Sequence, residues 1–267
     1  MSKTVITLTA IDNLMFDSFL VSRVLVIAPL RVARDTWPAE AKKWDHLSGL
    51  RISVAVGNEE ERRMALTGDA DVYVINRENV QWLVEKSGVP WKWDMLVVDE
   101  QSSFKNPQAK RFKALMKIRG KIKRVVGLTG TPASNGLMDL FAEYRLIDKG
   151  VRLGRFITRY REEFFRPDKT NGSVVYSYKP LPFAEEEIYR RIGDITISMK
   201  SVDFLDMPEK VVSENVVYMS AREKKEYERL QKDLVLELDG EEVTAANAAA
   251  LCQKLSQMAN GAVYTDD

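Results

Sequence analysis

Short apolar runs alternate with segments of helical character along the first half of the chain, and this alternation most constrains the fold. The runs expected to form strands lie at 23–30, 51–57, 71–76, 95–98 and 124–132. The helical segments between them lie at 36–44, 59–67, 80–86 and 107–118. Strands that alternate with helices pair in parallel, through right-handed crossovers. We therefore predict an α/β fold: a parallel sheet with helices on both faces, followed by a mostly helical insertion.

The apolar run Met95–Val98 leads directly into two carboxylates, Asp99 and Glu100. A continuous apolar run suits a strand that is buried on both faces. The two acids then lie at the carboxyl edge of the sheet, where open α/β folds bind ligands. In nucleotide-hydrolysing folds this position holds Mg²⁺ through one carboxylate and orients a water with the next. The alternative is a solvated acidic pair that only ends a strand.

Composition excludes several classes of protein. The chain has a net charge of +1, one cysteine (Cys252) and one histidine (His46). These numbers exclude an internal disulfide framework, argue against a His/Cys zinc site, and give no global attraction to nucleic acid or membrane. No apolar run approaches the ~20 residues of a membrane span, so we expect no membrane partner and a cytoplasmic location. Cys252 is interpreted as a core residue, and His46 as a loop residue.

Local signals refine the helices and divide the chain. Apolar residues at Val5, Leu8 and Ile11 predict a helix at the start, and Thr36 is a candidate N-cap for the segment 36–44. The second half predicts a hairpin at 166–178, strands at 195–200 and 211–219, and helices at 136–147, 156–165, 183–192, 221–238 and 243–258. We expect a sheet domain at 1–150 and a helical extension at 151–267.

Four strand-end segments occur in a recognisable order: Ala28-Pro-Leu30, Ile75-Asn-Arg-Glu78, Asp99-Glu-Gln-Ser102 and Leu128-Thr-Gly-Thr-Pro132. This order and spacing resembles the first motor lobe of superfamily two helicases, and most closely the Swi/Snf-like DNA translocases, including phage-encoded members. The last segment matches the third motif of that family letter for letter. The segments 137–147 and 207–227 are similar to the family's helical insertion and its exit. The resemblance implies a RecA-like, P-loop NTPase fold.

The resemblance also implies a site for ATP and Mg²⁺. Asp99 would bind Mg²⁺ and Glu100 would activate the hydrolytic water. Lys3 would pair with the β- and γ-phosphates, and the Thr4 hydroxyl would ligate Mg²⁺. From the residues alone, an N-terminal Lys-Thr pair usually has no such role.

Double-stranded DNA is the partner that the resemblance implies, through its phosphates rather than its bases. The residues that would contact one DNA strand are Pro29, Asn76 and Arg77. The motif that would couple nucleotide state to DNA contact is Thr129, Gly130 and Thr131. A second motor lobe or a partner protein is also expected.

The extent of the sequence shapes the expected activity. Only two residues precede Lys3, without the glycines of a phosphate loop, and the chain stops at Asp267, about where an arginine-bearing second lobe would begin. We therefore expect an N-terminal motor lobe with little or no ATPase activity alone, whose intact parent couples ATP hydrolysis to translocation. The rival hypotheses are a catalytically silent DNA- or protein-binding module and a structural or regulatory α/β protein.

Two clusters of basic residues leave alternatives open. The segment 105–124 holds nine basic residues and no acid, so it could bind phosphates, although a solvated helix face is the favoured interpretation. The segment 155–166 mixes arginines with aromatic residues. It could follow a DNA backbone, but its aromatics are better interpreted as the core stripe of a helix.

Overall fold

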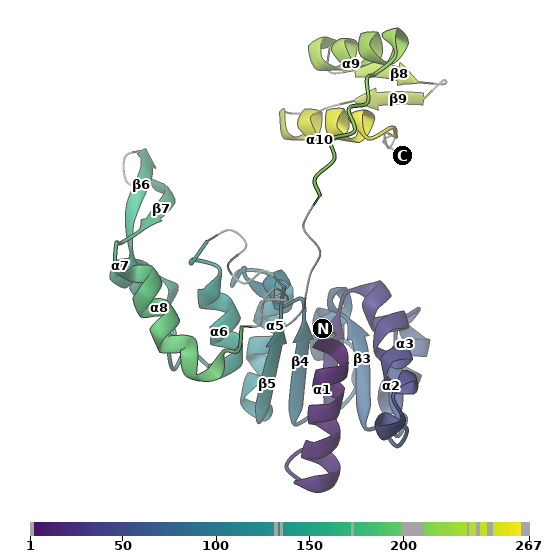
Figure 1. Cartoon of the computed structure of the whole chain (residues 1–267), viewed down its shortest axis with the longest axis vertical. Coiled ribbons are helices and arrows are strands. Elements are labelled where there is room, and N and C mark those ends of the chain that lie inside the picture. The colour runs from purple at the N-terminus through teal and green to yellow at the C-terminus, as the bar shows by residue number, and fades with distance from the viewer. Residues whose placement is uncertain are drawn as a thin grey trace. The chain divides into compact units, whose positions relative to one another are not determined.

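A five-stranded parallel sheet lies at the centre of the first part of the chain (Figure 1). The computed structural model describes residues 3–130, 133, 136–171, 174–198, 211–233, 235–238, 241–244 and 248–262. These residues belong to two compact units, Met1–Phe204 and Leu205–Asp267. The division of the chain expected at residue 150 remains a prediction.

The strands of the sheet align their carboxyl ends at one edge. They are β1 (Val24–Ala28), β2 (Ile52–Ala55), β3 (Val72–Asn76), β4 (Met95–Asp99) and β5 (Arg124–Leu128), in the spatial order β2-β3-β1-β4-β5. Ala28 pairs with Asn76, and Asp99 pairs with Leu128. The predicted parallel sheet is therefore confirmed, and every strand-end segment named above begins at the same edge.

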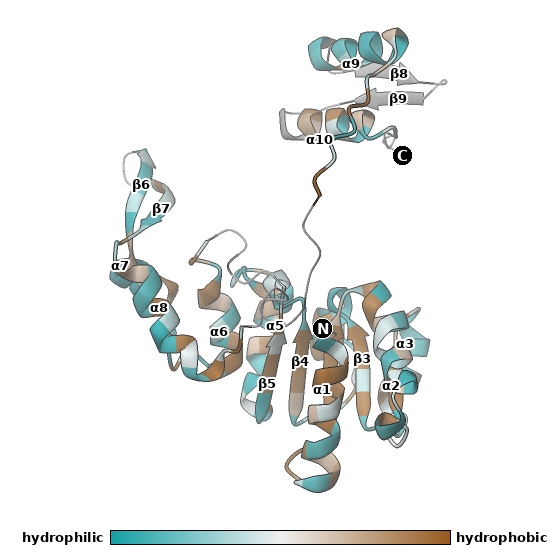
Figure 2. Cartoon of the chain, viewed as in Figure 1, coloured by the Kyte–Doolittle hydropathy of each residue, from teal (hydrophilic) through white to brown (hydrophobic). Residues whose placement is uncertain are grey.

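Helices cover both faces of this sheet, so β1, β3 and β4 are buried along their whole length. Side chains such as Leu25 and Leu96 share one core with helices α3 to α8, and alternate side chains such as Val26 and Val97 share another with α1 and α2. The strands are correspondingly apolar (Figure 2). The helices of the sheet region are α1 (Lys3–Asp12), α2 (Trp37–Lys43), α3 (Glu59–Thr67), α4 (Val80–Glu85) and α5 (Lys110–Ile118).

The start of α2 differs from the prediction. Thr36 is not an N-cap, because it lies in the helical region (φ −74°, ψ −50°) at the end of a π-helical segment, Val32–Thr36, that leads directly into α2. Helix α3 instead has a complete capping box, in which Asn58 and Glu61 each accept the other's backbone N–H.

The remainder of the first unit packs onto the same core as α3 to α5. It contains α6 (Leu140–Asp148), α7 (Ile157–Phe164), α8 (Ala184–Ile192) and an antiparallel hairpin of β6 (Phe165–Asn171) and β7 (Val174–Pro180). Tyr160 and Phe164 are buried with ring centroids 5.2 Å apart, and Phe165 is buried as well, so these aromatics are core residues as interpreted. The interpretation is wrong for Phe156, which is 61% exposed. The predicted hairpin is confirmed. The strand predicted at 195–200 is wrong over its described residues, which form a 3-10 turn and irregular chain.

The second unit departs further from the sequence prediction. It contains α9 (Ala221–Asp233), an antiparallel hairpin of β8 (Val235–Leu238) and β9 (Glu241–Thr244), and α10 (Ala248–Ala259). The predicted helices at 221–238 and 243–258 were extended too far into β-favouring residues such as Val235 and Val243. Residues 211–219 form no strand, and Val217 is 90% exposed. Cys252 is exposed rather than part of the core.

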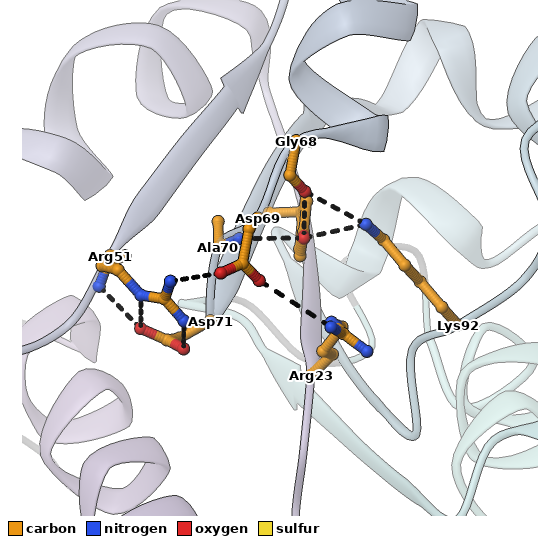
Figure 3. A network of polar contacts seen from close by, with 8 residues as sticks. Arg23, Arg51, Gly68, Asp69, Ala70, Asp71 and Lys92 are labelled. Carbon is orange, nitrogen blue, oxygen red and sulfur yellow. Dashed lines mark hydrogen bonds and ion pairs between the residues drawn. The ribbon is translucent and has the colours of Figure 1, made fainter.

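The opposite, amino edge of the sheet is tied together by a polar network (Figure 3). The carboxylate of Asp71 accepts hydrogen bonds from the backbone N–H of Arg51 at 3.0 Å and from its guanidinium at 2.7 and 3.0 Å. Asp69 lies 2.5 Å from the same guanidinium and 3.8 Å from that of Arg23. Burial alone would raise the pKa of Asp71, but the bonds from Arg51 outweigh it and hold that pKa below its usual value.

A tyrosine completes this network. The hydroxyl of Tyr73 donates to the carbonyl of Gly68 at 2.7 Å and accepts from the N–H of Ala70 at 3.0 Å and from Lys92 Nζ at 2.8 Å. Hydrogen bonds and ion pairs of these side chains thus connect the starts of β1, β2, β3 and β4. No helix in the described part of the chain is long and apolar enough to span a membrane.

We predict that Asp71→Asn destabilises the protein by about 1–3 kcal/mol, because Asp71 is largely buried and the substitution removes the charged acceptor of three Arg51 hydrogen bonds. The matched control is Asp35→Asn, which breaks the exposed Arg34–Asp35 pair and should leave the unfolding midpoint unchanged. Urea unfolding of both variants is the measurement. Equal effects from the two substitutions would contradict a structural role for the network.

Candidate functional site

Asp99, the last residue of β4, has a carboxylate whose orientation is fixed. Its side chain is 7% exposed; Oδ2 accepts a hydrogen bond from Trp37 Nε1 at 3.1 Å, and Oδ1 accepts from the N–H of Glu100 at 3.1 Å. Trp37 is itself fully buried in α2. Two donors from different elements therefore hold one carboxylate at the carboxyl edge of the sheet.

Glu100 adopts a backbone conformation that residues other than glycine rarely take. Its φ of 53° and ψ of 60° are left-handed, a conformation that costs on the order of 1–2 kcal/mol. Its carbonyl accepts a hydrogen bond from the N–H of Ser103 at 2.9 Å, which starts the 3-10 turn Gln101–Phe104. This sharp turn ends the strand and leaves the Glu100 side chain half-exposed.

Three segments far apart in the sequence meet beside Glu100. Lys3, at the start of α1, places its Nζ 3.7 Å from Glu100 Oε1, and both side chains are 42% exposed. Gly130 follows β5, and a Cβ added to it would lie 3.9 Å from the same Nζ. Thr4 is buried next to Lys3 in α1, at 8% exposed. The structure thus brings together Lys3, Glu100 and Gly130 from the predicted site residues.

The residues predicted to contact DNA lie along the same edge, on neighbouring strands. Pro29 follows β1, and its carbonyl accepts from the N–H of Ala33 at 2.8 Å. Asn76 ends β3, is 7% exposed and donates to Glu78 at 2.9 Å; Arg77 Nε also donates to Glu78 at 2.9 Å. Burial would raise the pKa of Glu78, but these bonds outweigh it and hold that pKa below its usual value. Glu78 therefore engages both Asn76 and Arg77, two of the residues predicted to contact DNA.

The coupling motif is described only in part. Thr129 and Gly130 follow the end of β5, where Thr129 is half-buried and Gly130 is exposed. Thr131 lies outside the described residues.

Gln101, which sequence reasoning left without a role, is a buried bridge from the acidic turn to α6. It is 4% exposed, and its Nε2 donates to the main-chain carbonyl of Glu143 at 2.9 Å. Its amide oxygen occupies the space over Gly127, where an added Cβ would lie 1.6 Å from it. A glycine within an apolar strand run indicates such a close approach, so Gly127 was the available signal.

Glu143 is the second residue that sequence reasoning missed. Its side chain is 1% exposed, and Oε1 has no hydrogen-bond partner in the described part of the chain. Burial, together with the nearby charge of Asp139, raises the pKa of Glu143 to about 7, although Lys105 opposes this shift. Lys105 also forms an ion pair with Asp139 at 3.3 Å. This carboxyl group therefore changes protonation in the neutral pH range.

A parallel sheet with a lysine, an Asp-Glu pair and a Thr-Gly segment at its carboxyl edge is the arrangement of a RecA-like lobe. The SNF2-related domain matches residues 1–261. The chain belongs to this family, so the resemblance inferred from the four strand-end segments is confirmed.

Two relatives that are similar in sequence support this assignment. Protein p41 of Acyrthosiphon pisum secondary endosymbiont phage 1 is 37% identical over 273 residues, which cover 100% of this chain and 59% of p41. Helicase swr1 of Emericella nidulans is 29% identical over 151 residues, which cover 53% of this chain and 8% of that protein. The chain thus spans 59% of the length of p41 and 8% of that of swr1.

A solved structure shows the same fold. The Sulfolobus solfataricus SWI2/SNF2 ATPase core in complex with dsDNA superposes with a TM-score of 0.59 at 23% identity. The match covers 96% of this chain and 51% of that one.

We predict that the protein loses stability relative to Glu143→Gln as pH rises. The folded-state pKa is raised from 4.5 to about 7, so the stabilising contribution of the bound proton is complete below the unfolded value and lost as pH passes through the folded value. At about 1.4 kcal/mol per unit, the difference between the two proteins should change by roughly 2–3 kcal/mol between pH 5 and pH 8.

Denaturant unfolding at several pH values measures this difference. The matched control is Glu162→Gln, on the exposed face of α7, which should follow the pH profile of the unsubstituted protein. A constant difference between Glu143→Gln and the unsubstituted protein across this pH range would refute the buried titration.

Proposed function

We propose that this chain is the first motor lobe of a DNA-stimulated ATPase, whose parent couples ATP hydrolysis to translocation along double-stranded DNA. The observation that supports this most directly is the convergence of Lys3, Glu100 and Gly130 beside the oriented carboxylate of Asp99. In this proposal residues 1–150 contain the nucleotide site and 151–267 form the extension. The protein would act in the cytoplasm, or in the host cytoplasm if a phage encodes it.

The residues at the edge fit a Mg²⁺-nucleotide complex. Asp99 offers a hard carboxylate oxygen that Trp37 keeps oriented, and Thr4 contributes a hydroxyl close to Lys3. A Mg²⁺ site of this kind relies on one or two carboxylates together with phosphate oxygens. Bound Mg²⁺ supplies charge neutralisation on the phosphates.

The Lys3–Glu100 pair suggests how nucleotide changes the site. The pair is half-exposed, so it contributes little stability and separates easily. A triphosphate would compete for Lys3 and release the Glu100 carboxylate. Glu100 could then accept a proton from the attacking water, while Lys3 balances charge on the phosphates.

For DNA, we propose that Pro29, Asn76 and Arg77 contact phosphates of one strand. Arg77 is bonded to Glu78, so a phosphate oxygen would replace the Glu78 carboxylate as its acceptor. Thr129, Gly130 and Thr131 would transmit nucleotide state to these contacts, since Gly130 lies close to Lys3. That the solved relative is a complex with dsDNA supports this partner.

We predict that Lys3→Ala weakens binding of a fluorescent Mg-ATP analogue by about tenfold or more, because it removes the cation that balances the phosphates. Glu100→Gln should keep binding, or tighten it by freeing Lys3, and should abolish any hydrolysis stimulated by double-stranded DNA. The control is Lys42→Ala, exposed in the last turn of α2, which should bind as the unsubstituted protein does. Unchanged affinity in Lys3→Ala would overturn the nucleotide site.

We predict that binding to double-stranded DNA weakens with salt, and that Arg77→Ala lowers the slope of log K against log salt by about 1, as expected for one phosphate contact. Fluorescence anisotropy at several salt concentrations measures the slope, with Lys42→Ala again as the control. A slope unchanged by Arg77→Ala would remove Arg77 from the interface.

A catalytically silent DNA- or protein-binding module is the second candidate. Salt-dependent DNA binding without turnover by this chain would support this candidate.

A further inference from the structure

The turn that contains Glu100 needs support from outside itself. A left-handed residue other than glycine persists only where its surroundings fix it. The turn's own hydrogen bond joins the N–H of Ser103 to the Glu100 carbonyl at 2.9 Å, and Gln101 within the turn is buried. Gln101 directly follows the strained residue, so fixing its side chain restricts the turn.

The space for Gln101 is built into the neighbouring strand. Gly127 in β5 pairs with Val98 in β4, one residue before Asp99. Any side chain at residue 127 would overlap the Gln101 amide, because an added Cβ would lie 1.6 Å from its oxygen. The glycine thus lets the side chain cross β5 and reach α6.

The acceptor of the bridge is itself held firmly. Helix α6 receives Gln101 at the carbonyl of Glu143, and its last turn accepts hydrogen bonds from the buried Arg119: Nε donates to the carbonyl of Leu146 at 2.5 Å, and Nη2 donates to that of Ile147. Arg119 precedes β5 in the chain, so α6 is fixed to the sheet at two places. The Gln101 bridge therefore ends on a rigid element rather than on a loop.

We propose that Gln101 is a positioning residue for Glu100: its amide, seated over Gly127 and bonded to Glu143, fixes the left-handed turn and connects it to α6. The conformation of the Glu100 turn is then tied to the position of α6. This inference deepens the proposed hydrolytic role of Glu100 and rests on it, but the bridge can be tested without hydrolysis.

The experiment compares Gln101→Met, which keeps the side-chain volume but has no N–H donor, with the unsubstituted chain. Amide hydrogen exchange should accelerate by about tenfold in residues 100–104, the change expected for loss of one hydrogen bond, and stay unchanged in β1. Unchanged exchange in 100–104 would overturn the proposal.

A paired substitution separates the hydrogen bond from packing. Gly127→Ala should destabilise the chain, since its methyl group collides with Gln101. The double variant Gln101→Ala/Gly127→Ala removes that collision and should regain stability, yet exchange in 100–104 should stay fast. Recovery of slow exchange in the double variant would show that packing alone holds the turn, and would overturn the proposal.

Nucleotide measurements distinguish this inference from the proposed function. Where the chain turns over ATP, Gln101→Met should lower turnover at least about tenfold with the KM for ATP within about twofold, because Lys3 is untouched. A fall in melting temperature with a matching rise in KM would indicate a structural role only, and would overturn positioning. If the unsubstituted chain binds no Mg-ATP, the proposed function fails, while the exchange result still decides whether Gln101 fixes the turn.

Discussion

Burial of the central strands on both faces is the constraint on which the rest of this molecule depends. Apart from Tyr73, whose hydroxyl bonds at the amino edge, β1, β3 and β4 carry only apolar side chains until β3 and β4 end at Asn76 and Asp99. The amide of Asn76 and the carboxylate of Asp99 therefore lie at the strand ends, on the one edge where the parallel strands finish. The sheet concentrates reactive side chains simply because its interior cannot accept them.

The two edges of the sheet use charge in opposite ways. At the amino edge, Asp71 is largely buried and accepts hydrogen bonds from three donors of Arg51, so its carboxylate is held in place by the protein itself. At the carboxyl edge, Lys3 and Glu100 share one half-exposed contact at 3.7 Å. The first arrangement resists exchange with a ligand, and the second permits it. This contrast explains why an ion pair of similar composition is structural at one edge and available for chemistry at the other.

Sequence reasoning succeeded where the signal was local. Apolar runs predicted the strands, and their alternation with helices predicted that the strands pair in parallel and end at one edge of the sheet. It failed at the Gln101–Glu143 bridge, which joins residues 42 positions apart through a main-chain carbonyl that no side-chain pattern reveals. It also failed at Thr36, where a π-helical segment continues the helix past an expected cap, and at β8 and β9, whose short alternation was read as helix.

The absence of a side chain at Gly127 has a consequence for the evolution of this lobe. Residues 101 and 127 share one volume, so a chain with this backbone can fill it from either position but not from both. A side chain at position 127 requires a small residue at position 101, and a long side chain at position 101 requires glycine at position 127. The two positions should therefore co-vary between homologous lobes, and a lineage can pass from one arrangement to the other only through an intermediate that leaves the space empty.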